Sequence, residues 1–94
     1  MIYELWIEKV AERDIEALDA GARGRVTDAI RRLATDPMGR GTKSLSGNLS
    51  SLRSLRVGPL RVCYEIDQAA RRVTIVAVGH RGRVYADIGR RRGS

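Results

Sequence analysis

The sequence predicts an α+β fold, in which two N-terminal helices pack on one face of a small, twisted and mainly antiparallel sheet. Three observations indicate this class. The chain has 94 residues, enough for one domain, 1–94, with a modest core. Apolar residues recur at helical spacing within residues 11–33. The second half holds three closely spaced apolar runs of strand type, which favour antiparallel pairing.

The N-terminal half predicts a strand followed by two helices. Residues 2–7 are rich in β-branched and aromatic side chains, as strands are. The first helical face consists of Ala11, Ile15, Leu18 and Ala22. Gly21 and Gly24 predict a break within residues 19–24. The second helical face consists of Val26, Ala29, Ile30 and Leu33, and the helix ends before Asp36-Pro37 because proline disfavours a helical residue ahead of it.

The C-terminal half predicts three strands and a short final helix. Residues 38–50 are rich in turn-forming residues and are expected to form a loop. Strands are expected at 52–57 and 60–67, with Gly58-Pro59 as the hairpin turn, and at 72–79. Residues 82–92 have room for a helix, since Val84 and Ile88 stand at i and i+4.

Period-two alternation predicts which strand residues face the helices. The core-facing residues are expected to be Leu55, Val57, Leu60, Val62, Tyr64 and Ile66. The opposite, open face is expected to carry Ser54, Arg56, Arg61, Cys63 and Glu65. Arg56 and Arg61 should therefore share one exposed surface across the hairpin.

Charge is distributed unevenly along the chain, whose net charge is +7. Residues 1–36 carry 6 basic and 8 acidic side chains, a net of −2, whereas residues 37–94 carry 12 basic and 3 acidic ones, a net of +9. Sixteen of the 18 basic residues are arginine, whose planar fork suits phosphate and can stack on bases. A polyanion-binding face is one interpretation, and a solvated arginine-rich surface is the other.

The single cysteine, Cys63, excludes an internal disulfide and a zinc site of several cysteines. No apolar run reaches the length of a membrane span, and residues 1–25 lack the apolar stretch of a signal peptide. We therefore expect a cytoplasmic protein without a cofactor or a membrane partner. The scattered acids and the single histidine also predict no metal site.

Three segments carry a resemblance to the RelE/ParE toxin superfamily, and together with the helix pair they cover nearly the whole chain. Residues 55–66, Leu-Arg-Val-Gly-Pro-Leu-Arg-Val-Cys-Tyr-Glu-Ile, resemble the central hairpin of RelE-type toxins. Residues 76–85, Val-Ala-Val-Gly-His-Arg-Gly-Arg-Val-Tyr, resemble their last strand and C-terminal segment. Residues 43–47 resemble the Lys-x-Leu-x-Gly stretch that precedes the hairpin.

The resemblance implies a toxin of a type II toxin–antitoxin pair that cleaves mRNA in the ribosomal A site without a metal. An acidic antitoxin, RelB-like or Phd-like, would silence it. Arg61 and Arg81 would then hold and neutralise the scissile phosphate. Tyr85 would transfer a proton or stack on a base, and His80 would stand where relatives place a basic or histidine residue. The further RNA contacts are expected from Lys43, Arg53, Arg56 and Arg83.

Three positions differ from RelE-type toxins, because Leu52 and Ser54 stand where RelE proper carries lysines and Leu60 stands where the hairpin usually has an aromatic residue. An alternative is therefore a toxin of the ParE branch, which binds DNA gyrase and cleaves nothing. A third interpretation is a basic RNA-binding module without toxicity.

Each candidate also has a structural interpretation that the sequence leaves open. His80 is the side chain whose ordinary pKa lies nearest neutrality, and it is either an acid–base group or a strand-end residue bound to backbone. Tyr85 could instead pack beside Val84 and Ile88. Arg53 could cap the sheet edge, and Glu65 is a general base or an ion-pair partner.

Overall fold

The computed structural model describes residues 2–92, which form an α+β fold as the sequence predicts. The elements follow in the order β1 (Glu4–Ile7), α1 (Lys9–Glu16), α2 (Ala20–Leu33), β2 (Thr42–Ser44), a 3-10 turn η1 (Gly47–Leu49), β3 (Arg53–Val57), β4 (Leu60–Asp67), β5 (Arg72–His80) and α3 (Arg81–Arg92). The predicted C-terminal helix is therefore present as α3.

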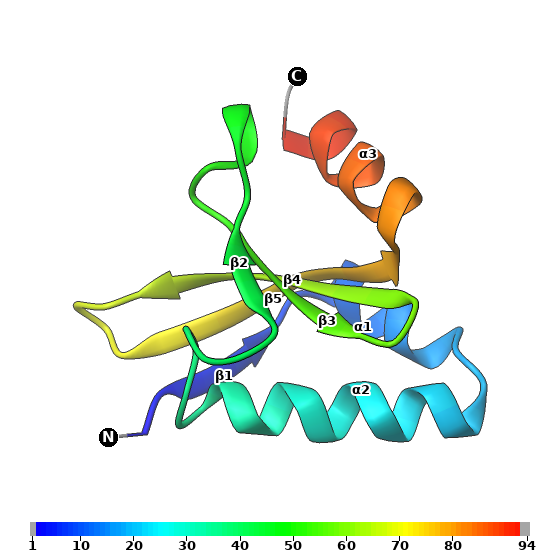
Figure 1. The fold of residues 1–94 in the computed structure, drawn as a ribbon, viewed down its shortest axis with the longest axis horizontal. Coiled ribbons are helices and arrows are strands. Elements are labelled where there is room, and N and C mark those ends of the chain that lie inside the picture. The colour runs from blue at the N-terminus through cyan, green and yellow to red at the C-terminus, as the bar shows by residue number, and fades with distance from the viewer. Residues whose placement is uncertain (1, 93–94) are drawn as a thin grey trace.

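The strands form one five-stranded sheet in the order β1-β5-β4-β3-β2 (Figure 1). The four strands from β2 to β5 pair antiparallel with their neighbours in sequence. In contrast, β1 pairs parallel with β5, the strand farthest from it along the chain. The sheet is therefore mainly antiparallel, with β1 and β2 at its two edges.

The two N-terminal helices are separated at residues 17–19, ahead of the predicted break. Asp19 caps α2, because its side chain accepts a hydrogen bond of 2.8 Å from the backbone N–H of Ala22. An aspartate at this position stabilises a helix start by about 1 kcal/mol. Gly21 and Gly24 are thus tolerated inside α2, and the prediction that Ala22 belongs to the first helix was wrong.

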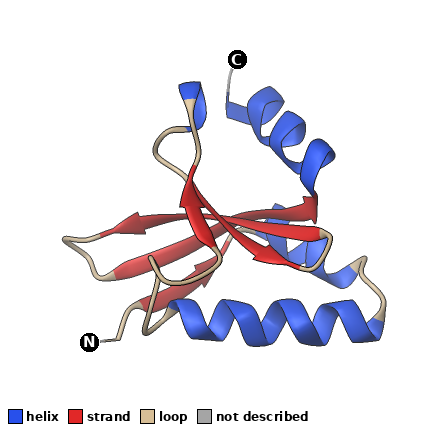
Figure 2. Ribbon diagram, in the orientation of Figure 1, coloured by secondary structure: helices blue, strands red, loops and turns tan. Residues whose placement is uncertain are grey.

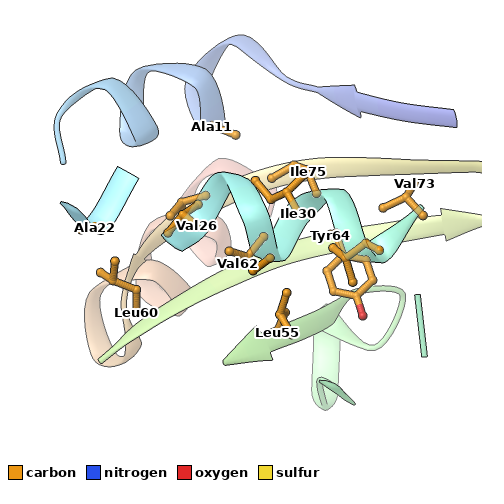
Figure 3. Close-up of a cluster of buried hydrophobic side chains, with 13 residues drawn as sticks. Ala11, Ala22, Val26, Ile30, Leu55, Leu60, Val62, Tyr64, Val73 and Ile75 are labelled. Carbon is orange, nitrogen blue, oxygen red and sulfur yellow. The ribbon is translucent and has the colours of Figure 1, made fainter. Parts of the chain in front are cut away.

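The main core lies between the sheet and the two N-terminal helices (Figure 3). Val26 and Ile30 of α2 lie over Val62 of β4, and Ala11 contributes from α1. The core-facing residues predicted for the hairpin are in this cluster or packed against it. The predicted alternation is therefore confirmed for the face that the helices cover.

The opposite face of the sheet is only partly open, because α3 packs across it (Figure 2). A second buried cluster forms there from Leu52, Cys63, Val76, Ala77, Val84 and Ile88, with Leu45, Leu49 and Tyr85 packed against it. The expectation that Cys63 projects from an open face was thus wrong. The helix needs somewhere to bury Val84 and Ile88, and this half of the sheet provides it.

Residues 38–50 are more ordered than the loop that the sequence predicts, since they contain β2 and η1. Strand β2 pairs with β3, and Arg53 ties the two together on the helix-covered side. Its guanidinium donates hydrogen bonds of 2.9 Å to the hydroxyls of Thr42 and Ser44. Three residues of polar side chains give too weak a strand pattern to be recognised from sequence.

None of the helices within residues 2–92 is long and apolar enough to cross a bilayer.

Candidate nucleic-acid interface

The β3–β4 hairpin brings two arginines into direct register. Val57 pairs with Leu60 around a two-residue turn, and Gly58 takes a φ of +59°, which favours glycine at the first turn position. Arg56 then pairs with Arg61 across the hairpin. Directly opposed residues of an antiparallel pair point to the same face, with Cβ atoms about 5 Å apart. The expectation that these two arginines share a surface is therefore confirmed.

A cleft of about 230 Å³ opens beside this arginine pair. Its walls are Gly41, Thr42, Lys43, Ser54, Arg56 and Arg61, and we call it the basic cleft. Lys43 of β2 pairs with Ser54 of β3. Ser54 is two residues before Arg56 on the same strand, so the Lys43–Ser54 pair and the Arg56–Arg61 pair lie on the same face of the sheet. Three cationic side chains from three adjacent strands thus surround one small space.

The cations of the basic cleft are not neutralised by the ion pairs that join described residues. Those pairs lie elsewhere, at Asp28–Arg31, Glu4–Arg72 and Asp87–Arg90. Arg61 donates to the backbone carbonyl of Leu60 at 3.2 Å, a contact without negative charge. Like charges opposed across a hairpin are unfavourable. The arrangement is therefore suited to an anion that enters from outside.

Tyr85 reaches the wall of the basic cleft from α3. Its hydroxyl lies 2.9 Å from the hydroxyl of Ser54, a residue that is only 1% exposed. This hydrogen bond joins a strand residue to a helix residue 31 positions later in the sequence. The side chain predicted from the C-terminal segment is thus brought to the hairpin, where it contacts Ser54 of the cleft wall.

His80 and Arg83 lie in a different place from Arg61. His80 pairs with Leu60, whose side chain belongs to the main core, so both residues point to the helix-covered face. His80 and Arg83 line a second cleft of about 350 Å³, whose other walls include Asp14 and Asp87. The structure therefore does not bring His80 together with Arg61.

The remaining candidates also occupy distinct positions. Arg81 is exposed as the first residue of α3 and lines neither of these two clefts. Arg53 pairs with Tyr64 and so faces the helix-covered side, where it caps the β2 edge. Leu52 is buried under α3. The groups that converge on the basic cleft are thus Lys43, Arg56 and Arg61, with Tyr85 hydrogen-bonded to Ser54 of the cleft wall.

The family to which the chain belongs follows from a sequence match. Residues 6–85 match the family described as the ParE toxin of the type II toxin–antitoxin system, parDE. The chain belongs to the ParE toxin family. The resemblance seen in its hairpin and C-terminal segment is therefore confirmed at the level of the RelE/ParE toxin superfamily. No curated protein matches the toxin by sequence alone.

Solved structures share the fold of this toxin. The RelBE2 toxin–antitoxin complex from Mycobacterium tuberculosis contains a chain of 29% identity with a TM-score of 0.79; the match covers 86% of the toxin and 93% of that chain. A chain of the archaeal RelE–RelB complex from Pyrococcus horikoshii matches at 24% identity and a TM-score of 0.75, covering 89% and 100%. The isolated E. coli RelE toxin matches at 18% identity with a TM-score of 0.71, and the match covers 95% of the toxin described here and 97% of that chain.

The sequence did not single out Ser54, Thr42 or Gly41 as parts of the toxin's site. Two signals pointed to Ser54: alternation placed it on the same face as Arg56, and it stands where RelE proper carries a lysine. Thr42 and Gly41 join the cleft because β2 pairs with β3, a contact that local pattern does not encode. Within residues 2–92, no three histidine, cysteine or acidic side chains are grouped closely enough to hold a metal ion.

Proposed function

We propose that the toxin binds RNA in the basic cleft and cleaves mRNA on the ribosome, using its own side chains rather than a metal ion. The observation that carries this proposal is the Arg56–Arg61 pair, with Lys43 beside it and no acidic residue in the cleft wall. Guanidinium and ammonium groups bind phosphate, which is the anionic group of a nucleic acid.

The chemistry requires stabilisation of a phosphorane as the ribose 2′-oxygen attacks the neighbouring phosphorus. Negative charge grows on the phosphoryl oxygens in that step, and fixed cations lower its free energy. Arg61 is the best-placed cation, because it is half-buried and held at the hairpin by the carbonyl of Leu60. Tyr85 would carry a proton to or from the reacting oxygens, while Arg56 and Lys43 would hold flanking phosphates.

A cognate antitoxin is the expected partner. The solved structures that match the toxin include RelB–RelE complexes, in which a toxin chain of the same fold is bound to its antitoxin. An acidic, partly disordered antitoxin, RelB-like or Phd-like, would neutralise the basic cleft and order itself on binding. The site of action would be the cytoplasm, where the ribosome and mRNA are.

A second candidate is inhibition of DNA gyrase without any cleavage. Two observations favour it. The matching family is named for parDE toxins, and the two positions where RelE proper carries lysines are a buried leucine, Leu52, and a buried serine, Ser54. Under this alternative the basic cleft would contribute to a protein interface.

The two candidates are separated by the variant Arg61→Ala, assayed on purified ribosomes programmed with mRNA and, in parallel, on gyrase. We expect wild-type toxin to cut the mRNA, and Arg61→Ala to cut it about 10²-fold more slowly, because one fixed donor to the developing charge is lost. Arg31→Ala is the matched control, since it removes the same charge from an exposed position on α2.

In cells, induction followed by mapping of mRNA 5′ ends should show new ends within coding regions. Intact mRNA together with lost supercoiling activity would contradict the nuclease proposal and support the gyrase alternative. Equal cleavage by Arg61→Ala and Arg31→Ala would contradict the role given to the basic cleft.

A further inference from the structure

A hydrogen bond between the hydroxyls of Ser54 and Tyr85 joins α3 to the sheet. Ser54 lies in the middle of the hairpin, between Lys43 of β2 and Cys63 of β4 in register. It lines the basic cleft, yet it is 1% exposed. A serine so deeply placed needs a partner for its hydroxyl, and Tyr85 is that partner.

The backbone of Tyr85 is held by its neighbours on α3. Val84 and Ile88 are each 2% exposed and pack in the second buried cluster, to which Tyr85 also contributes. This packing holds the base of the phenol ring, whereas the direction of the hydroxyl at its far end is set by a polar partner. The hydrogen bond to Ser54 supplies the missing restraint.

The pair also determines which proton is available. Each hydroxyl has one proton and can both donate and accept. When Ser54 donates to Tyr85, the phenol keeps its own proton for an oxygen atom of a ligand. An apolar side chain at position 54 would leave Tyr85 without this donor and without a fixed orientation.

We propose that Ser54 is a positioning residue, which holds the Tyr85 hydroxyl at the wall of the basic cleft for proton transfer to bound RNA. This inference rests on the proposed function, since it assigns Tyr85 a part in the cleavage reaction. It gives a role to a position at which the sequence shows only the loss of a lysine.

The test is a set of five variants assayed on programmed ribosomes under single-turnover conditions. In Ser54→Ala we expect the maximal cleavage rate to fall by up to about 100-fold, because misplacing a reacting group by about 1 Å has that effect. The half-saturating toxin concentration should stay unchanged, because Lys43, Arg56 and Arg61 remain. Ser54→Thr should restore most of the rate, since it restores the hydroxyl.

A double-mutant cycle guards against failure of the threonine variant to fold. Tyr85→Phe should lower the maximal rate at least as much as Ser54→Ala, and the double variant should be no slower than Tyr85→Phe alone. If the two losses multiply instead, Ser54 does not act through Tyr85 and the inference is wrong.

Ile88→Val is the matched control for a purely structural effect. It trims the packing of α3 one turn beyond Tyr85 and leaves both hydroxyls in place. We expect it to lower the midpoint of unfolding while the cleavage rate stays at the wild-type value. An equal loss of rate in Ile88→Val and Ser54→Ala would mean that loosened packing explains both, and would overturn the inference.

The same assay keeps the two proposals apart. If wild-type toxin does not cut RNA, the proposed function fails, and the positioning role fails with it. If wild-type toxin cuts RNA and Ser54→Ala cuts it equally fast, only the positioning role fails.

Discussion

Tyr64 of β4 lies in the main core (Figure 3). Its hydroxyl donates a hydrogen bond to the backbone carbonyl of Pro37, in the segment that follows α2. The ring is fully buried, so its hydroxyl can only be satisfied by another buried group. The hydrogen bond therefore fixes the entry of the segment that leads to β2. One residue thus connects the main core to the strand that carries Lys43.

We expect Tyr64→Phe to lower the free energy of unfolding by about 1–2 kcal/mol, because the Pro37 carbonyl loses its buried donor. Tyr3→Phe is the matched control, since the Tyr3 hydroxyl donates to Gln68 at an exposed position. Tyr3→Phe should change the free energy of unfolding by no more than about 0.5 kcal/mol. Urea denaturation of both variants measures the difference, and equal losses would contradict the importance of the buried hydrogen bond.

The pH dependence of stability gives this variant a second signature. Burial raises the pKa of Tyr64 above its ordinary value of 10.0, and the hydrogen bonds from Arg53 and Thr42 oppose the shift. The pKa of Tyr64 is higher in the folded state than in the unfolded state. The neutral, buried phenol therefore contributes its full stabilisation below pH 10, and this contribution is lost as the pH rises from 10 through the folded-state pKa. The wild-type toxin should therefore lose more stability than Tyr64→Phe over that alkaline range.

At the scale of elements, the packing of α3 on the sheet depends on a β-bulge in β5. The register between β4 and β5 shifts at Cys63/Tyr64, so that Val76 is an extra residue in β5. Strict alternation would send Val76 and Ala77 to opposite faces, yet both pack beneath α3. The bulge thus widens the apolar surface on which the helix rests.

We expect Ile88→Ala to lower the free energy of unfolding by about 2–5 kcal/mol, because it leaves a cavity between α3 and this surface. In a domain of this size that is a large share of the total stability. Ala86→Ser, at an exposed position of the same helix, should cost less than about 0.5 kcal/mol. Thermal unfolding followed by circular dichroism compares the two, and similar midpoints would show that α3 packing contributes little.

At the scale of the whole molecule, the sheet separates two different surfaces. One face is covered by α1 and α2, from the half of the chain with a net charge of −2. The other carries the basic cleft and α3, from the half with a net charge of +9. An anionic polymer should therefore bind with a preferred orientation.

RNA binding should weaken as the salt concentration rises, and the steepness of that dependence should reflect how many cations of the basic cleft contact phosphates. For a single strand, the slope of log K against log salt is about −0.7 for each phosphate contacted, so three contacts predict a slope of about −2. We expect Lys43→Gln to make it shallower by about 0.7, and Arg31→Gln on α2 to leave it unchanged. Fluorescence anisotropy with a labelled oligoribonucleotide measures the slopes; equal slopes for both variants would contradict binding in the cleft.

Much of this toxin was determined by local pattern. Alternation placed Arg56 and Arg61 on one face because a strand has a period of two and the Gly58-Pro59 turn sets the register. The motifs of the hairpin and of residues 76–85 were enough to identify the superfamily. Helical spacing predicted α2 and the position of Val84 and Ile88 within α3.

Only the tertiary structure decided how these parts combine. The parallel pairing of β1 with β5, the packing of α3 over Cys63 and the contact of Tyr85 with Ser54 all join segments far apart in sequence. The same long-range packing separates His80 from Arg61, although both stand in motifs that resemble one family. Such contacts depend on which apolar surfaces remain to be buried after the local elements form, and no single segment of the sequence contains that information.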